Sequence, residues 1–202
     1  VFQWINVPSD QKMTDPAYGT VPTKDIPVHK IGATTVRVIA GDFTPIEGGP
    51  STGPFETRVK ILMLDLVLAP GATFSHDLSE GLDNCLLYFY GPEGSGNIGG
   101  YESAIEHGVA AHFDATDPKR RRFELTAGDE GLSVLVFAGK KLHQKVAWHG
   151  PFVMTTDEEI RKTIHEYRSG TFLRKTVEWD YKVLSKFPPE LRAKALATKD
   201  EL

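Results

Sequence analysis

Short apolar stretches separated by Gly, Pro, Asp and Asn dominate the chain from about residue 33 to residue 148. Apolar and polar positions alternate around Val36, Val38 and Ala40, and alternation with a period of two is typical of a strand with one buried face. Many short strands with turns between them predict an all-β fold, an antiparallel sandwich or barrel of the jelly-roll kind. The candidate strands are Thr35–Ala40, Arg58–Leu68, Cys85–Tyr90, Gly108–Phe113, Phe123–Leu125, Leu132–Ala138 and Val146–Trp148.

One segment interrupts the strand pattern. Residues 46–55, IEGGPSTGPF, are rich in Gly and Pro, and this composition predicts a surface loop rather than a core strand.

The pattern changes to a helical one after residue 154. Thr155 or Thr156 can cap the helix, and three acidic residues at 157–159 lie where the helix dipole favours negative charge. Ile160, Ile164 and Tyr167 then form an apolar stripe, and Gly170 supplies the stop. A helix is therefore expected over residues 155–170, packed on a sheet. In the tail, Pro188-Pro189 can open a short final helix, which would make two C-terminal helices.

Composition narrows the class of protein. The chain has 202 residues, of which 40% are hydrophobic and 25% charged, as in globular domains. A net charge of −4 argues against a surface that coats nucleic acid, and no apolar run reaches the length of a membrane span. The single cysteine, Cys85, excludes an internal disulfide and fits a reducing compartment.

Two stretches resemble a known family. Residues 149–172 read HGPFVMTTDEEIRKTIHEYRSGTF, which resembles the C-terminal end of the pirins, two-domain cupin proteins. Residues 2–18, FQWINVPSDQKMTDPAY, resemble the pirin segment that leaves the first cupin barrel and enters the second. Between them, LAPGATFSH, CLLYFYG and VFAGKKL follow the pirin order. The resemblance implies a segment leading into the barrel and packing on it at 1–32, a cupin barrel at 33–154, the helix at 155–170 and an extended tail at 171–202.

A cupin that works as an enzyme holds its metal with two His one residue apart, a Glu a few residues on and a distant third His. Alternate residues of a strand point to the same side, so such a pair aims both rings into the barrel. Here only His76 is an imidazole, and Leu78 stands at the second position. We therefore expect no metal site, no catalytic residue and no cofactor in this chain. A weak alternative set is His76, Glu80, His107 and His112.

The resemblance leaves three functional readings open. The first is a metal-free binding or scaffold module in a larger assembly. It would associate with a partner protein or with itself through the face left by a missing first barrel. The candidates for covering that face are a strand at Phe2–Val7 and the tail around Trp179. The second is part of an iron-dependent, pirin-type quercetin 2,3-dioxygenase or a nuclear transcriptional co-regulator, with iron in a first barrel elsewhere. The third is a metal-free cupin that binds a small ligand.

Enzyme activity is not expected from this chain alone, nor is direct binding of nucleic acid or membrane. The basic run Lys119, Arg120, Arg121 and Arg122 fits either a nuclear-import signal or a charged loop tip. Pirin-like proteins are cytoplasmic or nuclear, and that location is expected here. The last four residues, Lys199–Leu202, spell an endoplasmic-reticulum retrieval signal if they form the true carboxy terminus, and the lumen is then the alternative.

Overall fold

The computed structural model describes residues 3–16, 19–45, 48–91, 96–99 and 107–173. The predicted final helix after Pro188, the residues around Trp179 and the Lys199–Leu202 sequence lie outside the described residues. The chain forms two compact units, of which the first comprises Val1–Pro8 and Pro22–His143 and the second comprises Ser9–Val21 and Gln144–Leu202.

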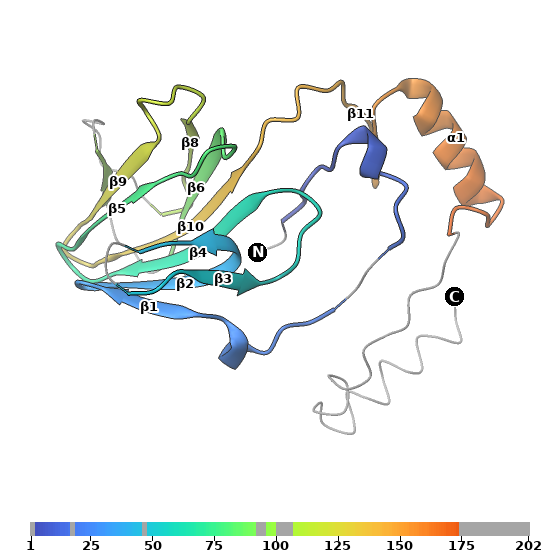
Figure 1. Cartoon of the computed structure of the whole chain (residues 1–202). Helices are drawn as coiled ribbons and strands as arrows, with labels where there is room; N and C mark the ends of the chain where they lie inside the picture. Colours follow the sequence, from blue (N-terminus) through green and yellow to red (C-terminus); the bar gives the residue numbers. More distant parts are fainter. Residues whose placement is uncertain (1–2, 17–18, 46–47, 92–95, 100–106, 174–202) are drawn as a thin grey trace. The chain divides into compact units, whose positions relative to one another are not determined.

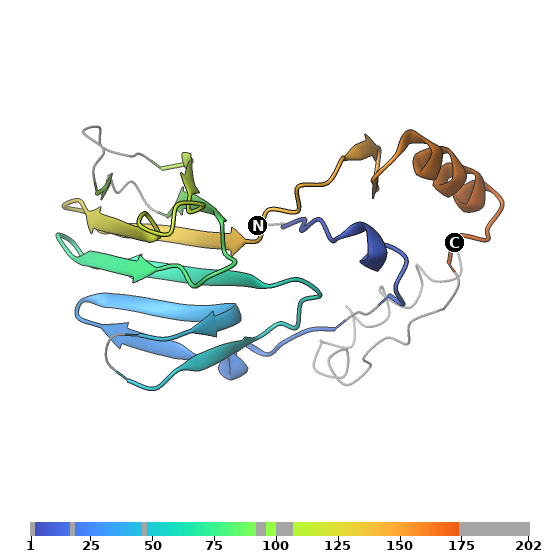
Figure 2. The same ribbon diagram turned by 45° about the horizontal axis from the view of Figure 1, so that its top comes forward.

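Two antiparallel sheets build the first unit (Figures 1 and 2). The larger sheet has the strand order β1-β2-β4-β10-β6-β8, with β3 also paired to β2, and the smaller sheet has the order β5-β9-β7. This arrangement confirms the predicted all-β, antiparallel jelly-roll class. The strands of the larger sheet are β1 Val28–Ile31, β2 Thr34–Phe43, β3 Ser51–Pro54, β4 Ile61–Leu68, β6 Asn84–Tyr90, β8 Ala110–Asp114 and β10 Leu132–Gly139; those of the smaller are β5 Thr73–Asp77, β7 Gly96–Ile98 and β9 Arg122–Ala127.

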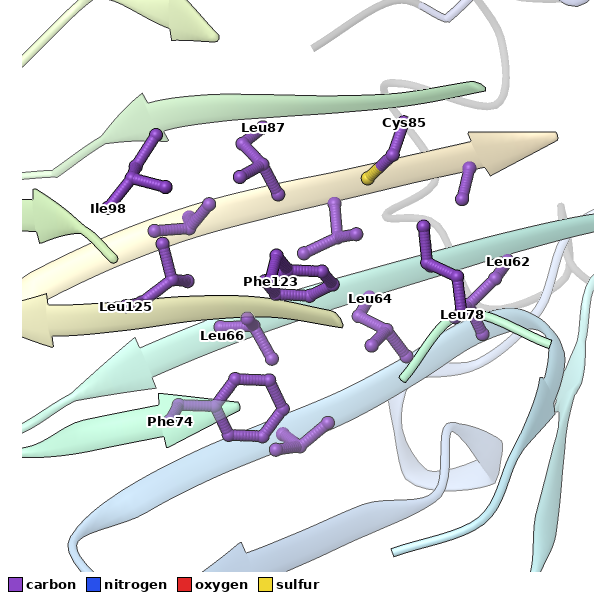
Figure 3. Close-up of a cluster of buried hydrophobic side chains, with 14 of the residues drawn as sticks. Leu62, Leu64, Leu66, Phe74, Leu78, Cys85, Leu87, Ile98, Phe123 and Leu125 are labelled. Atoms are coloured by element: carbon purple, nitrogen blue, oxygen red, sulfur yellow. The ribbon is translucent and has the colours of Figure 1, made fainter. Parts of the chain in front are cut away.

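The interior between the two sheets is filled by apolar side chains. In β4 every second residue is buried, from Leu62 through Leu64 and Leu66 to Leu68, which is the pattern that the alternation predicts. Across from them, Phe123 and Leu125 of β9 project into the same space (Figure 3). These side chains belong to one continuous cluster, so the barrel has a packed hydrocarbon core.

The predicted surface loop at residues 46–55 is wrong in its second half. Ser51–Pro54 form β3, in which Gly53 pairs with Gly41 of β2. A Cβ at position 53 would lie 2.3 Å from the backbone nitrogen of Ala40, so only glycine permits this approach. The glycine that seemed to exclude a strand is what allows this strand to pair.

The expected strand at Phe2–Val7 is also absent where the structure describes it, because residues 3–8 adopt no strand. Apolar alternation alone does not form a strand, since the backbone N–H and C=O groups need a neighbour to pair with. No strand in the described part of the chain pairs with this segment.

The described part of the second unit contains a 3-10 helix at Ser9–Gln11, a hairpin and an α-helix. Strands β11 (Ala147–His149) and β12 (Phe152–Met154) pair with each other, and the helix α1 (Asp157–Arg168) packs against both. Thr156 caps the helix: its side chain accepts from the Glu159 backbone N–H, while the Glu159 carboxylate accepts from the Thr156 backbone N–H. This capping box confirms the predicted helix start.

Candidate functional site

His76 lies on β5 and faces the barrel interior. Its ring is 5.1 Å from that of Phe43 and 6.0 Å from that of Phe123, measured between centroids. Burial among these rings lowers the pKa of His76, and the neighbouring Asp77 carboxylate acts in the opposite direction. His76 is therefore a neutral, partly buried side chain in an aromatic environment.

A second histidine, which the sequence did not single out, lies in the same cluster. His29 of β1 also contacts Phe43, with 5.5 Å between ring centroids, and its Nε2 is 2.8 Å from the Ser51 hydroxyl. The sequence VHKI carried no signal for it, because apolar and polar residues do not alternate there and the apolar Val28 is the exposed one. The run is only four residues long, and it was included in the segment leading into the barrel.

The other candidate ligands lie elsewhere. His112 of β8 is exposed and hydrogen-bonds through Nε2 to the Asn84 side-chain oxygen at 2.5 Å. His107 is exposed in a turn, and Glu80 is exposed in the loop after β5, where its carbonyl accepts from the Lys60 ammonium at 2.6 Å. The structure does not bring these residues together with His76. Within the described ranges, no three His, Cys, Asp or Glu side chains are grouped so as to hold a metal ion.

The residues present do not fit a cupin metal centre. Leu78 occupies the position of the second imidazole and is buried in the core. The Asp83 carboxylate is 3.7 Å from the Arg121 guanidinium, to which it is committed. What remains near Phe43 is the pair His76 and His29, and no third ligating side chain in the described ranges joins them, which makes a poor site for a first-row transition metal.

Cys85 offers no nucleophile. It points from β6 into the core and is fully buried, and burial raises the pKa of its thiol to about 12. The thiolate is therefore scarce at neutral pH, as the sequence position within an apolar strand predicts.

The basic run at 119–122 divides into two pairs. The Arg121 guanidinium donates to four backbone carbonyls, those of Leu78, Ser79, Leu82 and Ala115. Arg122 pairs with Asp77 and Glu124. The folded chain thus presents Lys119 and Arg120 as its most accessible cations in this run, and the import role stays a prediction.

A surface cleft of about 480 Å³ lies at the end of the barrel where β2, β3 and the segment leading into β4 meet. Its lining includes Asp42, Glu56, Arg58 and Lys60. Asp42 already accepts from the Thr52 hydroxyl at 2.7 Å, and Lys60 is held by the Glu80 carbonyl. Ligand sites are usually enclosed and mostly apolar, and this polar, exposed cleft lacks both properties.

Several large side chains lie next to one another on the side of the larger sheet that faces away from the core. Neighbouring strands place Met63, Phe137 and Leu86 in one cross-strand row, and Leu135 and Tyr88 in the next. We call these five residues the outer face. Leu135 is already buried and the other four are partly buried.

One polar network borders the outer face. Arg37 forms a 3.0 Å ion pair with Asp65, which also accepts a hydrogen bond from the Tyr90 hydroxyl. Burial, together with this bond to the Asp65 carboxylate, raises the pKa of Tyr90. The network is internally paired, so it can be covered without leaving a lone charge.

Comparisons with known proteins agree with this fold. Residues 63–173 match the pirin C-terminal cupin domain. A putative quercetin 2,3-dioxygenase of Pseudomonas aeruginosa is 31% identical over 175 residues, covering 85% of this chain and 56% of that protein. Human pirin is 31% identical over 174 residues, covering 83% and 54%. A crystal structure of quercetin 2,3-dioxygenase from Acinetobacter baumannii superposes with a TM-score of 0.72 at 27% identity, covering 84% and 55%.

Fold and comparisons together define a cupin domain. The two sheets, their apolar filling and the capped helix that follows are those of the C-terminal cupin of pirins. The chain belongs to the pirin family, and it spans about half the length of the curated relatives that it matches. No helix in the part of the chain that the structure describes has the length and apolarity needed to cross a bilayer.

Proposed function

We propose that this cupin domain is a binding and scaffold module that pairs with a second cupin barrel and has no catalytic metal site of its own. The observation that carries the proposal is the outer face, a set of large apolar side chains on the solvent side of the larger sheet. Apolar patches of this kind mark surfaces that another protein element covers. The part of this chain that aligns covers only 56% and 54% of these two relatives, and the rest of their length supports a second barrel as the occupant.

Association through the outer face is testable with the chain itself. We expect it to self-associate as its concentration rises, because a second copy is the nearest substitute for a second barrel. Met63→Lys puts a charge in the outer face and should weaken association at least about tenfold in Kd. Val109→Lys places the same charge on another exposed residue and is the matched control. Light scattering after gel filtration measures both, and a monomer at every concentration would contradict the proposal.

The proposal that this chain has no metal site depends on which ligating side chains surround His76. We expect the chain to retain far less than about one equivalent of iron, copper or nickel after loading and desalting, since no group of three ligating side chains gathers around His76 in the described ranges. Elemental analysis gives the metal content. Stoichiometric metal that disappears in His76→Ala and persists in His149→Ala would show that the interior does hold an ion and would refute this part of the proposal.

A second candidate function follows from the relatives' names. Several proteins similar to this chain are named quercetin 2,3-dioxygenases, among them the Pseudomonas aeruginosa protein and the Acinetobacter baumannii crystal structure described above. In this reading the chain is the non-catalytic half of such an enzyme, and another barrel holds iron. A quercetin turnover assay on a longer polypeptide that includes this chain separates the two functions. Turnover favours the dioxygenase, and no turnover favours a binding and scaffold module without enzyme activity.

Cytoplasmic or nuclear location belongs to the same proposal and stays a prediction. It is supported by membership of the pirin family and by the exposed Lys119 and Arg120. The endoplasmic-reticulum alternative depends on residues 199–202, outside the described part of the chain.

A further inference from the structure

Residues 9–16 belong to the second unit and lie beside the helix α1. Two hydrogen bonds fix the start of this segment to the chain that leads into the hairpin. The Ser9 backbone N–H donates to the Gln144 side-chain oxygen at 3.0 Å, and the Gln144 side-chain amide donates to the Ser9 hydroxyl at 3.3 Å. The segment is therefore held against elements that come more than a hundred residues later in the sequence.

A cavity of about 150 Å³ lies between this segment and α1. The helix contributes residues three and four positions apart, which share one face. Every lining residue belongs to the second unit, so the cavity is complete within that unit. The lining consists of Ser9, Lys12 and Met13 from the segment, Met154 from β12, and Glu159, Lys162, Thr163 and Glu166 from α1.

The lining combines a buried part with charged groups of both signs. Met154 is buried and belongs to the small core of this unit, together with Ile160. Thr163 is buried too, and Met13 adds a second thioether. Methionine side chains adapt their shape to small apolar groups. The cavity thus offers apolar contact next to charge, and a ligand site uses the first for affinity and the second for orientation.

One pair of opposite charges comes from the two walls. Burial lowers the pKa of Lys12, and the Glu159 carboxylate of α1 raises it. The Glu159 Oε2 accepts from the backbone N–H groups of Thr155 at 2.9 Å and Thr156 at 3.0 Å, and these bonds lower the pKa of Glu159. Glu159 is therefore a fixed negative charge at the helix start, and it keeps a cation at position 12.

A second pair of charges lies along α1. The Lys162 ammonium is 4.0 Å from the Glu166 carboxylate, and the Glu166 side chain is only 19% exposed. Ion pairs near the surface contribute little to stability, so a ligand that carries both charges can exchange with them at little cost. A ligand with a single charge would leave one lining group without a counter-charge in a partly buried place.

The volume restricts the ligand further. A cavity of about this size holds a molecule of about six non-hydrogen atoms. A small α-amino acid has this size, and it carries one ammonium group, one carboxylate and a short apolar side chain. Its two charges match those of the lining, and its side chain matches Met154.

We propose that the cavity between residues 9–13 and α1 binds a small zwitterion of the α-amino-acid class. The Lys12 ammonium pairs with the ligand carboxylate. Because Glu159 already accepts two backbone N–H bonds, Glu166 is the carboxylate that pairs with the ligand ammonium. The site lies outside the barrel, so this inference does not depend on the proposed pairing with a second cupin.

Titration of the unmodified chain with L-alanine, followed through the NMR signals of the α1 amides, tests the proposal. We expect saturable shifts with a Kd in the millimolar range, because so few ligand atoms make limited contact. Propionate lacks the ammonium group and ethylammonium lacks the carboxylate, so each should bind at least about tenfold more weakly. The proposal is overturned if no shift saturates, or if L-alanine binds no better than either analogue.

Variants assign the two charges. Lys12→Met removes the ammonium, keeps a side chain of similar shape and should weaken L-alanine binding at least about tenfold. Lys24→Met makes the same change in the other 3-10 helix, Thr23–Asp25, which does not line the cavity, and should leave the Kd unchanged. Glu166→Gln should reduce the affinity for L-alanine to that for propionate. Unchanged L-alanine binding in both Lys12→Met and Glu166→Gln would place the ligand elsewhere and refute the site.

Discussion

Arg121→Ala is expected to destabilise the barrel by about 1.5–3 kcal/mol, the range for hydrogen bonds that involve a charged group. The guanidinium donates to the carbonyls of Leu78 at 2.9 Å, Ala115 at 2.7 Å, Ser79 at 2.5 Å and Leu82 at 3.2 Å. It also lies 3.7 Å from the Asp83 carboxylate, and its side chain is only 17% exposed. Alanine would leave these acceptors without their donor in a place that water reaches poorly.

The neighbouring residue provides a matched control. Arg120 is 83% exposed and makes a single 3.9 Å ion pair with Asp117, so Arg120→Ala should cost less than about 0.5 kcal/mol. Urea unfolding curves of the two variants give the difference directly. If both variants unfolded at the same urea concentration as the unmodified chain, Arg121 would not be holding the loop at residues 78–83. Arg121→Lys should recover little, because an ammonium group cannot reach four carbonyls in different directions.

This network also explains a limit of reading the sequence. Lys119–Arg122 is one basic run in the sequence, and nothing in the run distinguishes Arg121 from its neighbours. Its four acceptors come from residues 78–82 and from Ala115, and the fold alone brings the first group close. The composition of a charged run is visible in the sequence, whereas the role of each charge depends on long-range geometry.

Other features could be predicted from the sequence because they depend on residues close together along the chain. The helix start at Thr156 depends on residues three positions apart, and the buried faces of β4 and β10 follow from alternation within eight residues. That these strands close into a jelly roll was predicted from the family resemblance. His76 was singled out as the one imidazole at the family's metal position.

The features that the sequence reading missed depend on contacts distant along the chain. β3 pairs because Gly53 permits close approach to β2, which a count of Gly and Pro cannot reveal. His29 shares the contacts of Phe43 with His76, although these two histidines are far apart in sequence. In β1 the apolar Val28 is exposed and His29 lies on the less exposed face, so the polarity of this four-residue run does not separate a strand from the leading segment.

Phe123→Ala is expected to cost about 3–5 kcal/mol, the usual range for removing a large aromatic side chain from a core. Phe123 is 1% exposed and contacts three rings, with centroids 6.2 Å from Phe74, 6.0 Å from His76 and 6.4 Å from Phe113. It comes from the smaller sheet and projects against the larger one, so its loss leaves a void between the layers (Figure 3). Chemical unfolding monitored by circular dichroism measures the cost.

The same substitution tests whether burial lowers the pKa of His76. With Phe123 gone, water can reach the imidazole, and its lowered pKa should move back toward the ordinary value of 6.5. Phe123→Leu keeps most of the apolar volume, so it should cost less stability and leave the pKa of His76 low. Histidine ring signals followed by NMR through a pH titration report that pKa in each variant that remains folded. If Phe123→Leu raised the pKa of His76 fully to its ordinary value, contact with the Phe123 ring rather than burial would be what lowers that pKa.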